Sequence, residues 1–93
     1  KSALESCVRY VASELGEDNI RVHAISAGAM QTRAASGIHD LAGLLKTTQE
    51  RAPLQRLCTP REVGELMAFL AGPNSQGMTG GIHYVDGGYN ILG

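Results

Sequence analysis

Two short strand-like runs with a strongly marked helix between them constrain this chain more than any other feature. The runs lie at residues 20–25 and 82–85, and both are rich in β-branched side chains. Between them, residues 59–62 read Thr-Pro-Arg-Glu, a capping box with proline at the first helical position. A strand, a helix and a strand in this order predict two parallel strands joined by a right-handed crossover.

Two amphipathic helices are predicted from apolar residues that recur at helical spacing. Residues 1–15 carry one stripe, made of Leu4, Cys7, Val8, Val11, Ala12 and Leu15. Gly16 follows this helix as its predicted left-handed C-cap. The helix that begins at Pro60 carries a second stripe, made of Val63, Leu66, Met67 and Leu70. We expect both stripes to be buried, and the second helix to end at Gly72 and Pro73.

The segment at residues 33–52 has weaker signals. Asp40 could cap a short helix that includes Leu41, Leu44 and Leu45. Gly37 and Gly43 weaken that interpretation, because glycine disfavours helix.

The order helix, strand, loop, helix, strand places the chain in the α/β class. Its 93 residues allow one domain at most. Parallel strands are normally buried on both faces and flanked by further strands, and only two are predicted here. We therefore expect residues 1–93 to be the C-terminal portion of a doubly wound, Rossmann-type parallel sheet, within a single larger domain.

Composition argues against several classes of partner. Eight basic and nine acidic residues give a net charge of −1, without the basic excess typical of nucleic-acid binding. No run approaches the ~20 apolar residues of a membrane span. Cys7 and Cys58 are too few and too distant for a disulfide scaffold, which predicts free thiols and a cytoplasmic protein. His23, His39 and His83 are too dispersed for a metal site, and we expect His23 and His83 at a core edge or interface.

Two places could carry chemistry. Lys1 projects beside the apolar stripe of its helix, and is either a solvated lysine or a cation aimed into a site. The loop at residues 26–32 leaves the carboxyl end of a strand, where open α/β sheets bind ligands. Its small residues allow a ligand to approach the backbone, and Thr32 offers a hydroxyl group. A plain connection between a strand and a helix would have a similar composition.

Several short motifs make the prediction of fold and function more specific. Residues 20–28 (Ile-Arg-Val-His-Ala-Ile-Ser-Ala-Gly), 79–80 (Thr-Gly) and 84–88 (Tyr-Val-Asp-Gly-Gly) together resemble the C-terminal third of short-chain dehydrogenases/reductases. Residues 34–38 (Ala-Ala-Ser-Gly-Ile) and 50–56 (Glu-Arg-Ala-Pro-Leu-Gln-Arg) resemble, within that superfamily, the enoyl-acyl-carrier-protein reductases of type II fatty-acid synthesis. The resemblance extends over essentially the whole chain.

The resemblance implies an oxidoreductase that reduces the trans-2 double bond of an enoyl-acyl-carrier-protein thioester with NADH or NADPH. Lys1 matches the active-site lysine, which holds the nicotinamide-ribose hydroxyls. The family's cofactor loop matches Ala27, Gly28, Ala29, Met30 and Thr32. Backbone groups at Met30 would pair with the nicotinamide carboxamide, and the Thr32 hydroxyl would reach the pyrophosphate. Ala29 replaces the family's proline, and Met30 its usual isoleucine.

The resemblance also assigns residues 33–52 to a mobile lid over the acyl chain. Its substrate-lining positions match Ala34, Ala35, Ile38, Leu41 and Leu44. The catalytic tyrosine of the family precedes the lysine and would lie upstream of Lys1, so we expect no turnover from residues 1–93 alone. Related reductases pack their last strand and the preceding helix against a symmetry mate in a homotetramer. We expect the same of the whole protein, and at least a dimer of this chain.

Two alternatives stay open at this point. The first is another short-chain reductase, such as a 3-oxoacyl-acyl-carrier-protein reductase, which the spacing of the upstream tyrosine would distinguish. The second is a non-catalytic assembly fragment, which only pairs its helices and strands with itself or with a larger subunit.

Overall fold

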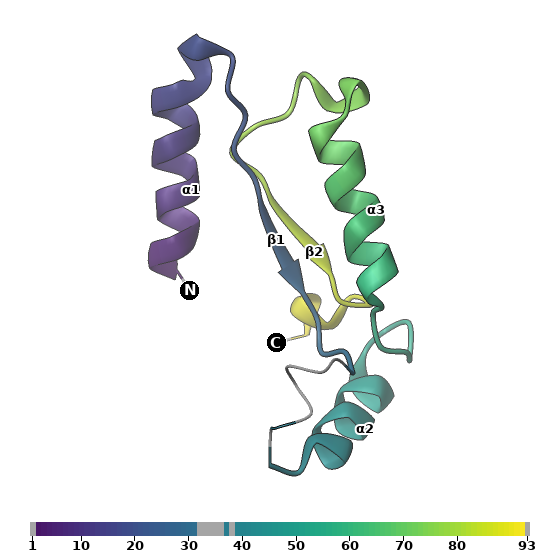
Figure 1. The fold of residues 1–93 in the computed structure, drawn as a ribbon. Coiled ribbons are helices and arrows are strands. Elements are labelled where there is room, and N and C mark those ends of the chain that lie inside the picture. The colour runs from purple at the N-terminus through teal and green to yellow at the C-terminus, as the bar shows by residue number, and fades with distance from the viewer. Residues whose placement is uncertain (1, 32–36, 38, 93) are drawn as a thin grey trace.

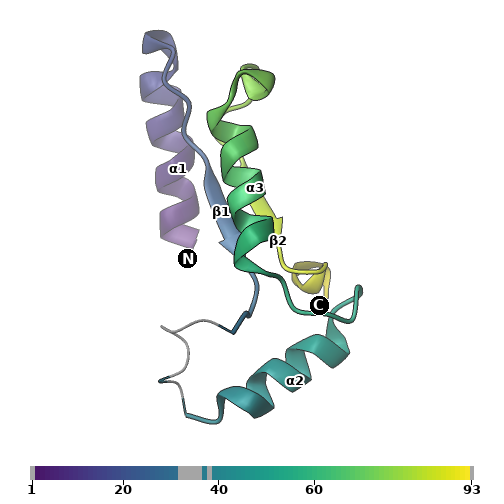
Figure 2. The same cartoon turned by 45° about the vertical axis from the view of Figure 1, so that its right-hand side comes forward.

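The computed structural model describes residues 2–31, 37 and 39–92. Its main elements are α1 (Ser2–Leu15), β1 (Ala24–Ala27), α2 (Leu41–Arg51), α3 (Pro60–Ala71) and β2 (Ile82–Val85). The two strands run between α1 and α3, and α2 lies beyond their carboxyl ends (Figures 1 and 2). This arrangement puts the loop after β1 and the turn after β2 at the same end of the molecule.

The two strands are parallel, which confirms the predicted pairing. Ala24 lies opposite Ile82 and Ala27 lies opposite Val85. The predicted bounds of the first strand, residues 20–25, are wrong at both ends, because the partner strand begins only at Ile82. Ser26 and Ala27, expected in the loop, are therefore part of the ladder.

Helix α3 has the bounds that its sequence signals predict. The Thr59 hydroxyl accepts a hydrogen bond from the Glu62 N–H at 3.2 Å, and the Glu62 carboxylate accepts one from the Thr59 N–H at 3.0 Å. The helix ends at Ala71, followed by Gly72 and Pro73. The capping box is confirmed because both of its bonds join residues only three positions apart.

A buried serine and an arginine secure the end of α3. The Ser75 hydroxyl lies 2.9 Å from the carbonyl oxygens of both Phe69 and Leu70. The Arg21 guanidinium donates to the Ser75 carbonyl oxygen at 2.7 Å and lies 3.4 Å from that of Gly72. Arg21 thus supplies a further donor to the carbonyl groups just after α3 and ties the approach to β1 to the end of that helix.

Two predicted helix termini are wrong in detail. Gly16 is not the left-handed cap of α1: it opens a short 3₁₀ turn, Gly16–Asp18, and Asn19 takes the left-handed conformation with φ 60°. Asparagine tolerates this conformation better than most residues. Asp40 does precede α2, but its carboxylate makes no capping hydrogen bond and its own φ is 55°. Helix α2 continues through Gly43 as far as Arg51.

The core is smaller than the apolar stripes predict. Among the described residues, those that are apolar and buried are Val8, Ala12, Leu45, Ala52, Cys58 and Leu70. Met67, on the predicted stripe of α3, is 57% exposed, and Leu4, Cys7 and Val11 of α1 are also exposed. The prediction that both stripes are buried is wrong for these residues, because two strands provide too little surface to cover them. The radius of gyration is 15.3 Å, against about 12 Å for a compact domain of this length.

Candidate functional site

A groove of about 320 Å³ lies at the carboxyl ends of the two strands. The loop after β1, helix α2 and the turn after β2 contribute its lining, which comprises Ser26, Ala27, Gly28, Ala29, Leu44, Thr48, Tyr84, Asp86, Tyr89 and Asn90. Three predicted cofactor residues, Ala27, Gly28 and Ala29, therefore share one groove with a predicted substrate residue, Leu44. This is the edge at which open α/β sheets bind ligands.

Gly28 brings the loop backbone against the neighbouring turn. Its N–H donates to the Val85 carbonyl oxygen at 2.9 Å, which extends the sheet by one bond. A Cβ at this position would lie 2.8 Å from the Cβ of Asp86. Side chains do not pack that closely, so the absence of a side chain here permits the approach of the two segments.

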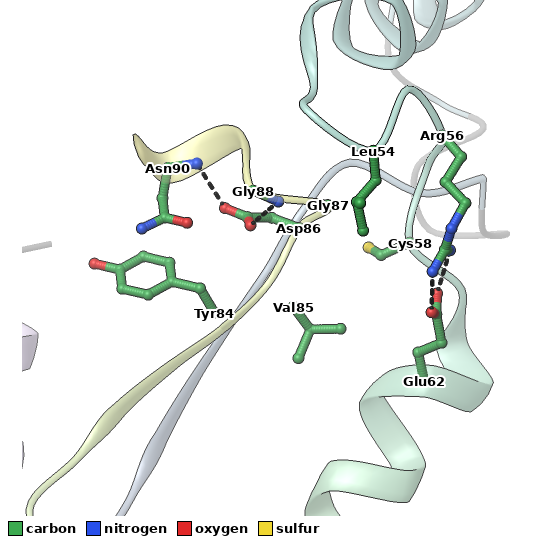
Figure 3. A pocket seen from close by; sticks show the side chains of 10 residues that line it. All are labelled: Leu54, Arg56, Cys58, Glu62, Tyr84, Val85, Asp86, Gly87, Gly88 and Asn90. Atoms are coloured by element: carbon green, nitrogen blue, oxygen red, sulfur yellow. Dashed lines mark hydrogen bonds and ion pairs between the residues drawn. The ribbon is translucent and has the colours of Figure 1, made fainter. Parts of the chain in front are cut away.

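Asp86 organises the turn that follows β2. Its carboxylate accepts hydrogen bonds from the N–H groups of Gly88 at 3.0 Å and Asn90 at 2.9 Å (Figure 3). Gly87 and Gly88 both have positive φ, at 66° and 90°. These bonds hold the 3₁₀ turn η4 (Tyr89–Ile91), whose first two residues line the groove. In the sequence, Asp86 was noted only within the motif at residues 84–88 and not as a site residue, although Asp-Gly-Gly is a strong turn signal.

A second hollow of about 310 Å³ shares Tyr84, Asp86 and Asn90 with the groove (Figure 3). Arg56 and Glu62 lie on its lining and form a two-bond ion pair, at 2.9 and 2.7 Å. The hydrogen bonds from Arg56 lower the pKa of the Glu62 carboxyl group from 4.5 to about 2. Because Glu62 also belongs to the capping box, the pair joins the segment before α3 to the start of that helix.

Cys58 lies in this segment and reaches the loop after β1. The residue is 6% exposed, and its sulfur lies 3.4 Å from the Gly28 carbonyl oxygen and 3.6 Å from that of Ala29. Cys7 is exposed on α1, and both thiols are free, as predicted. The position of Cys58 at the site was not predicted, because a contact between residues 30 positions apart leaves no local pattern in the sequence.

The family model for enoyl-(acyl carrier protein) reductases matches residues 1–90. This chain belongs to the enoyl-(acyl carrier protein) reductase family. The resemblance drawn from its motifs is therefore confirmed. The match includes the loop after β1, Cys58 and the turn that carries Asp86.

Individual members of the family agree with this assignment. The NADH-dependent enoyl-acyl-carrier-protein reductase FabI of Rickettsia felis is 52% identical over 93 residues. The solved structure of the Bacillus cereus reductase with NADP+ and indole naphthyridinone is 46% identical, with a TM-score of 0.92. That of Anaplasma phagocytophilum in complex with NAD is 42% identical, with a TM-score of 0.89. These matches confirm the α/β class and the Rossmann-type fold.

The chain covers only part of each of these reductases. All of its residues are matched in the three relatives, but they amount to 36% of the length of each one. Within the described residues, no helix combines the length and the apolar character that a membrane crossing requires.

The remaining reductase-site predictions fall into two groups. Met30 and Leu41 are described and half-buried, but neither is on the lining of the groove. The structure therefore brings together four of the six described site residues. The others lie outside the described residues: Lys1, Thr32, Ala34, Ala35 and Ile38.

A histidine pair occupies the opposite end of the strands. The Nε2 atom of His83 lies 3.0 Å from the Nδ1 atom of His23, just before β1. Both side chains are half-buried, as predicted for the edge of a core. Burial, together with the neighbouring His83, lowers the pKa of His23 below 6.5. Neither histidine is on the lining of the groove, although His83 directly precedes Tyr84, which is.

Proposed function

We propose that this chain forms the nicotinamide-binding part of an enzyme that reduces the trans-2 double bond of enoyl-acyl-carrier-protein thioesters. The proposal concerns the whole protein, because the chain spans 36% of the length of its relatives. Its main support is the groove in which the loop after β1 faces a residue of α2. The names of the relatives, which include an NADH-dependent reductase and structures with NAD or NADP+, support the same cofactor class.

The backbone of the loop suits the nicotinamide half of NADH. The N–H groups of Ala29 and Met30 have no acceptor within the described residues, so they are available to a ligand. The small side chains at positions 27–29 allow that ligand to approach closely. When bound, the dinucleotide would supply the hydride for the reduction. We further propose that Lys1 holds the ribose hydroxyls and that Thr32 donates to the pyrophosphate.

The segment at residues 33–52 is proposed as the cover of the acyl chain. Leu44 supports this role, because it lies on the groove and its side chain is 49% exposed, ready to contact an apolar ligand. Leu41 lies one helical turn earlier on α2. Ala34, Ala35 and Ile38 would complete an apolar slot, and a slot of this kind favours a hydrocarbon chain over a polar substrate.

A homo-oligomer, a tetramer in the whole protein, is proposed from the exposed apolar residues of α3 and β2. Met67, Phe69 and Tyr84 are all exposed. These two elements match those that related reductases pack against a symmetry mate, where exposed apolar side chains would be covered. We also propose a cytoplasmic location, since the described thiols are free and a reducing compartment keeps them so.

The test is an assay of the whole protein with NADH and a trans-2-enoyl thioester. We expect loss of NADH absorbance with the enoyl thioester, and none with the matching saturated thioester. A 3-oxoacyl thioester of the same chain length is the second substrate. Oxidation of NADH by the 3-oxoacyl thioester alone would replace the proposal with a different short-chain reductase. Turnover with neither substrate, with NADH or NADPH, would favour a non-catalytic assembly role.

A further inference from the structure

Two successive carbonyl groups of the loop after β1 face the same sulfur atom. The Cys58 thiol lies 3.4 Å from the oxygen of Gly28 and 3.6 Å from that of Ala29, so its single proton is shared between them. In an extended strand, successive carbonyls point to opposite sides. The chain has therefore left the strand geometry at Gly28, and both peptide groups have turned toward Cys58.

This orientation determines where the N–H groups of the same peptides point. In a trans peptide the N–H lies opposite the C=O, and the peptide bonds of the described residues are all trans. The N–H groups of Ala29 and Met30 therefore point away from Cys58. A pair of adjacent N–H groups directed outward is suited to an electron-rich oxygen atom of a ligand.

The segment that carries Cys58 is well placed to hold this orientation. The Arg56–Glu62 pair and the capping bond from the Thr59 N–H fix the chain on both sides of Cys58. On the loop, the Gly28 N–H is already bound to Val85. Gly28 is therefore held at both of its backbone groups: its N–H donates to Val85, and its carbonyl accepts from the Cys58 thiol. Cys58 and Asp86, which touches Gly28 from the turn, line the same hollow (Figure 3).

We propose that Cys58 is a positioning residue for the nicotinamide end of the cofactor. It acts through the loop, because its thiol proton holds the two carbonyls inward and so keeps the Ala29 and Met30 N–H groups outward. The inference rests on the proposed function, since it requires the loop to bind a nicotinamide dinucleotide.

The test compares two ligands on the whole protein. NADH has the nicotinamide, whereas ADP-ribose has the rest of the dinucleotide without it. Cys58→Val removes the donor at similar volume, Cys58→Ala is a second variant without a donor, and Cys58→Ser keeps a donor. Cys7→Ser, on the exposed face of α1, is the matched control. Thermal unfolding shows which variants are folded, and titration calorimetry gives the dissociation constants of both ligands.

We expect Cys58→Val and Cys58→Ala to raise the dissociation constant of NADH about fivefold, which corresponds to one lost hydrogen bond. Their affinity for ADP-ribose should not change. Cys58→Ser and Cys7→Ser should bind both ligands as the unsubstituted protein does. Equal weakening of both ligands, or no weakening of either, would overturn the role of Cys58 while the proposed function stands. Failure of the unsubstituted protein to bind either NADH or NADPH would overturn both proposals.

Discussion

Gly28 and Asp86 approach so closely that a Cβ at position 28 would lie 2.8 Å from the Asp86 Cβ and 2.9 Å from its Cα. The two residues belong to segments that are far apart in the sequence, one after β1 and one after β2. Their contact joins the loop proposed to bind the cofactor to the turn whose carboxylate holds η4. Any shift of one segment must therefore be transmitted to the other.

Gly28→Ala should lower both stability and cofactor affinity. The added methyl group meets the Cα and Cβ atoms of Asp86, which cannot move away as the far end of a flexible side chain would. We expect a loss of about 1–3 kcal/mol in the free energy of unfolding, typical of overpacking, together with weaker NADH binding. Chemical denaturation and NADH titration of the whole protein measure the two effects. Gly77→Ala, with open space around its Cβ, is the control. Unchanged values for Gly28→Ala would contradict the observed packing.

Glu62→Gln should flatten the acid side of the stability profile. The folded-state pKa of Glu62 is about 2 against an ordinary 4.5, so the unfolded chain binds a proton first as the pH falls. The contribution to stability is therefore present above pH 4.5 and is lost as the pH falls through about 2. The effect should weaken at high salt, since the pair is partly exposed.

Unfolding measured from neutral pH downward tests this prediction. Glu65→Gln serves as the control, because its 3.5 Å pair with Arg61 is more exposed and lies outside the capping box. An acid slope of Glu62→Gln as steep as that of the unsubstituted protein would show that another carboxylate dominates.

Stability should also fall between neutral and mildly acidic pH because of His23. Its folded-state pKa is below 6.5, so the unfolded chain is protonated first, and the stabilising contribution is full above pH 6.5. That contribution is lost as the pH falls through the lowered folded-state value. His83 and Arg21, the neighbours that disfavour a charge here, face His23 from β2 and from the approach to β1. His23→Asn should remove this slope, whereas His39→Asn, at an exposed position, should retain it. Parallel profiles for the two variants would exclude His23 as the cause.

Thr32→Val should raise the dissociation constant of NADH by about tenfold. The loss corresponds to ~1.5 kcal/mol for a hydrogen bond to a charged pyrophosphate oxygen. Thr47→Val, on the exposed side of α2, makes the same change away from the groove. A titration of Thr32→Val that overlays the control would remove Thr32 from the proposed cofactor site.

Charged substitutions on α3 should dissociate the protein. We expect the whole protein to sediment as a symmetric homo-oligomer, and Met67→Lys to shift it toward a smaller species. Gln76→Lys, which adds the same charge in the turn after α3, should leave the assembly intact. Residues 1–93 alone, if folded, should be at least dimeric. A folded monomer of this chain at micromolar concentration would refute the expected dimer of the chain. A monomeric whole protein would refute the proposed tetramer.

The features that sequence predicted best are those with local causes. Helix α3 was predicted at both ends, because a capping box and a Gly-Pro pair act within a few residues. The bounds of β1 depend on Ile82, the first residue of a partner far along the chain, so the run of β-branched residues could not reveal them. The same limit applies to the site. Gly28 was predicted from its own loop, whereas Cys58 reaches that loop across 30 positions.

The direction of the peptide groups at Ala29 and Met30 has an evolutionary consequence. A loop that offers its backbone places few demands on the side chains that it carries, so these two positions are free to drift while the ligand stays the same. The demands fall instead on Gly28, which must lack a side chain to approach Asp86, and on position 58, which is proposed to present a donor beneath the loop. In this protein, substitutions at Ala29 and Met30 are therefore expected to alter cofactor binding less than substitutions at Gly28 or Cys58.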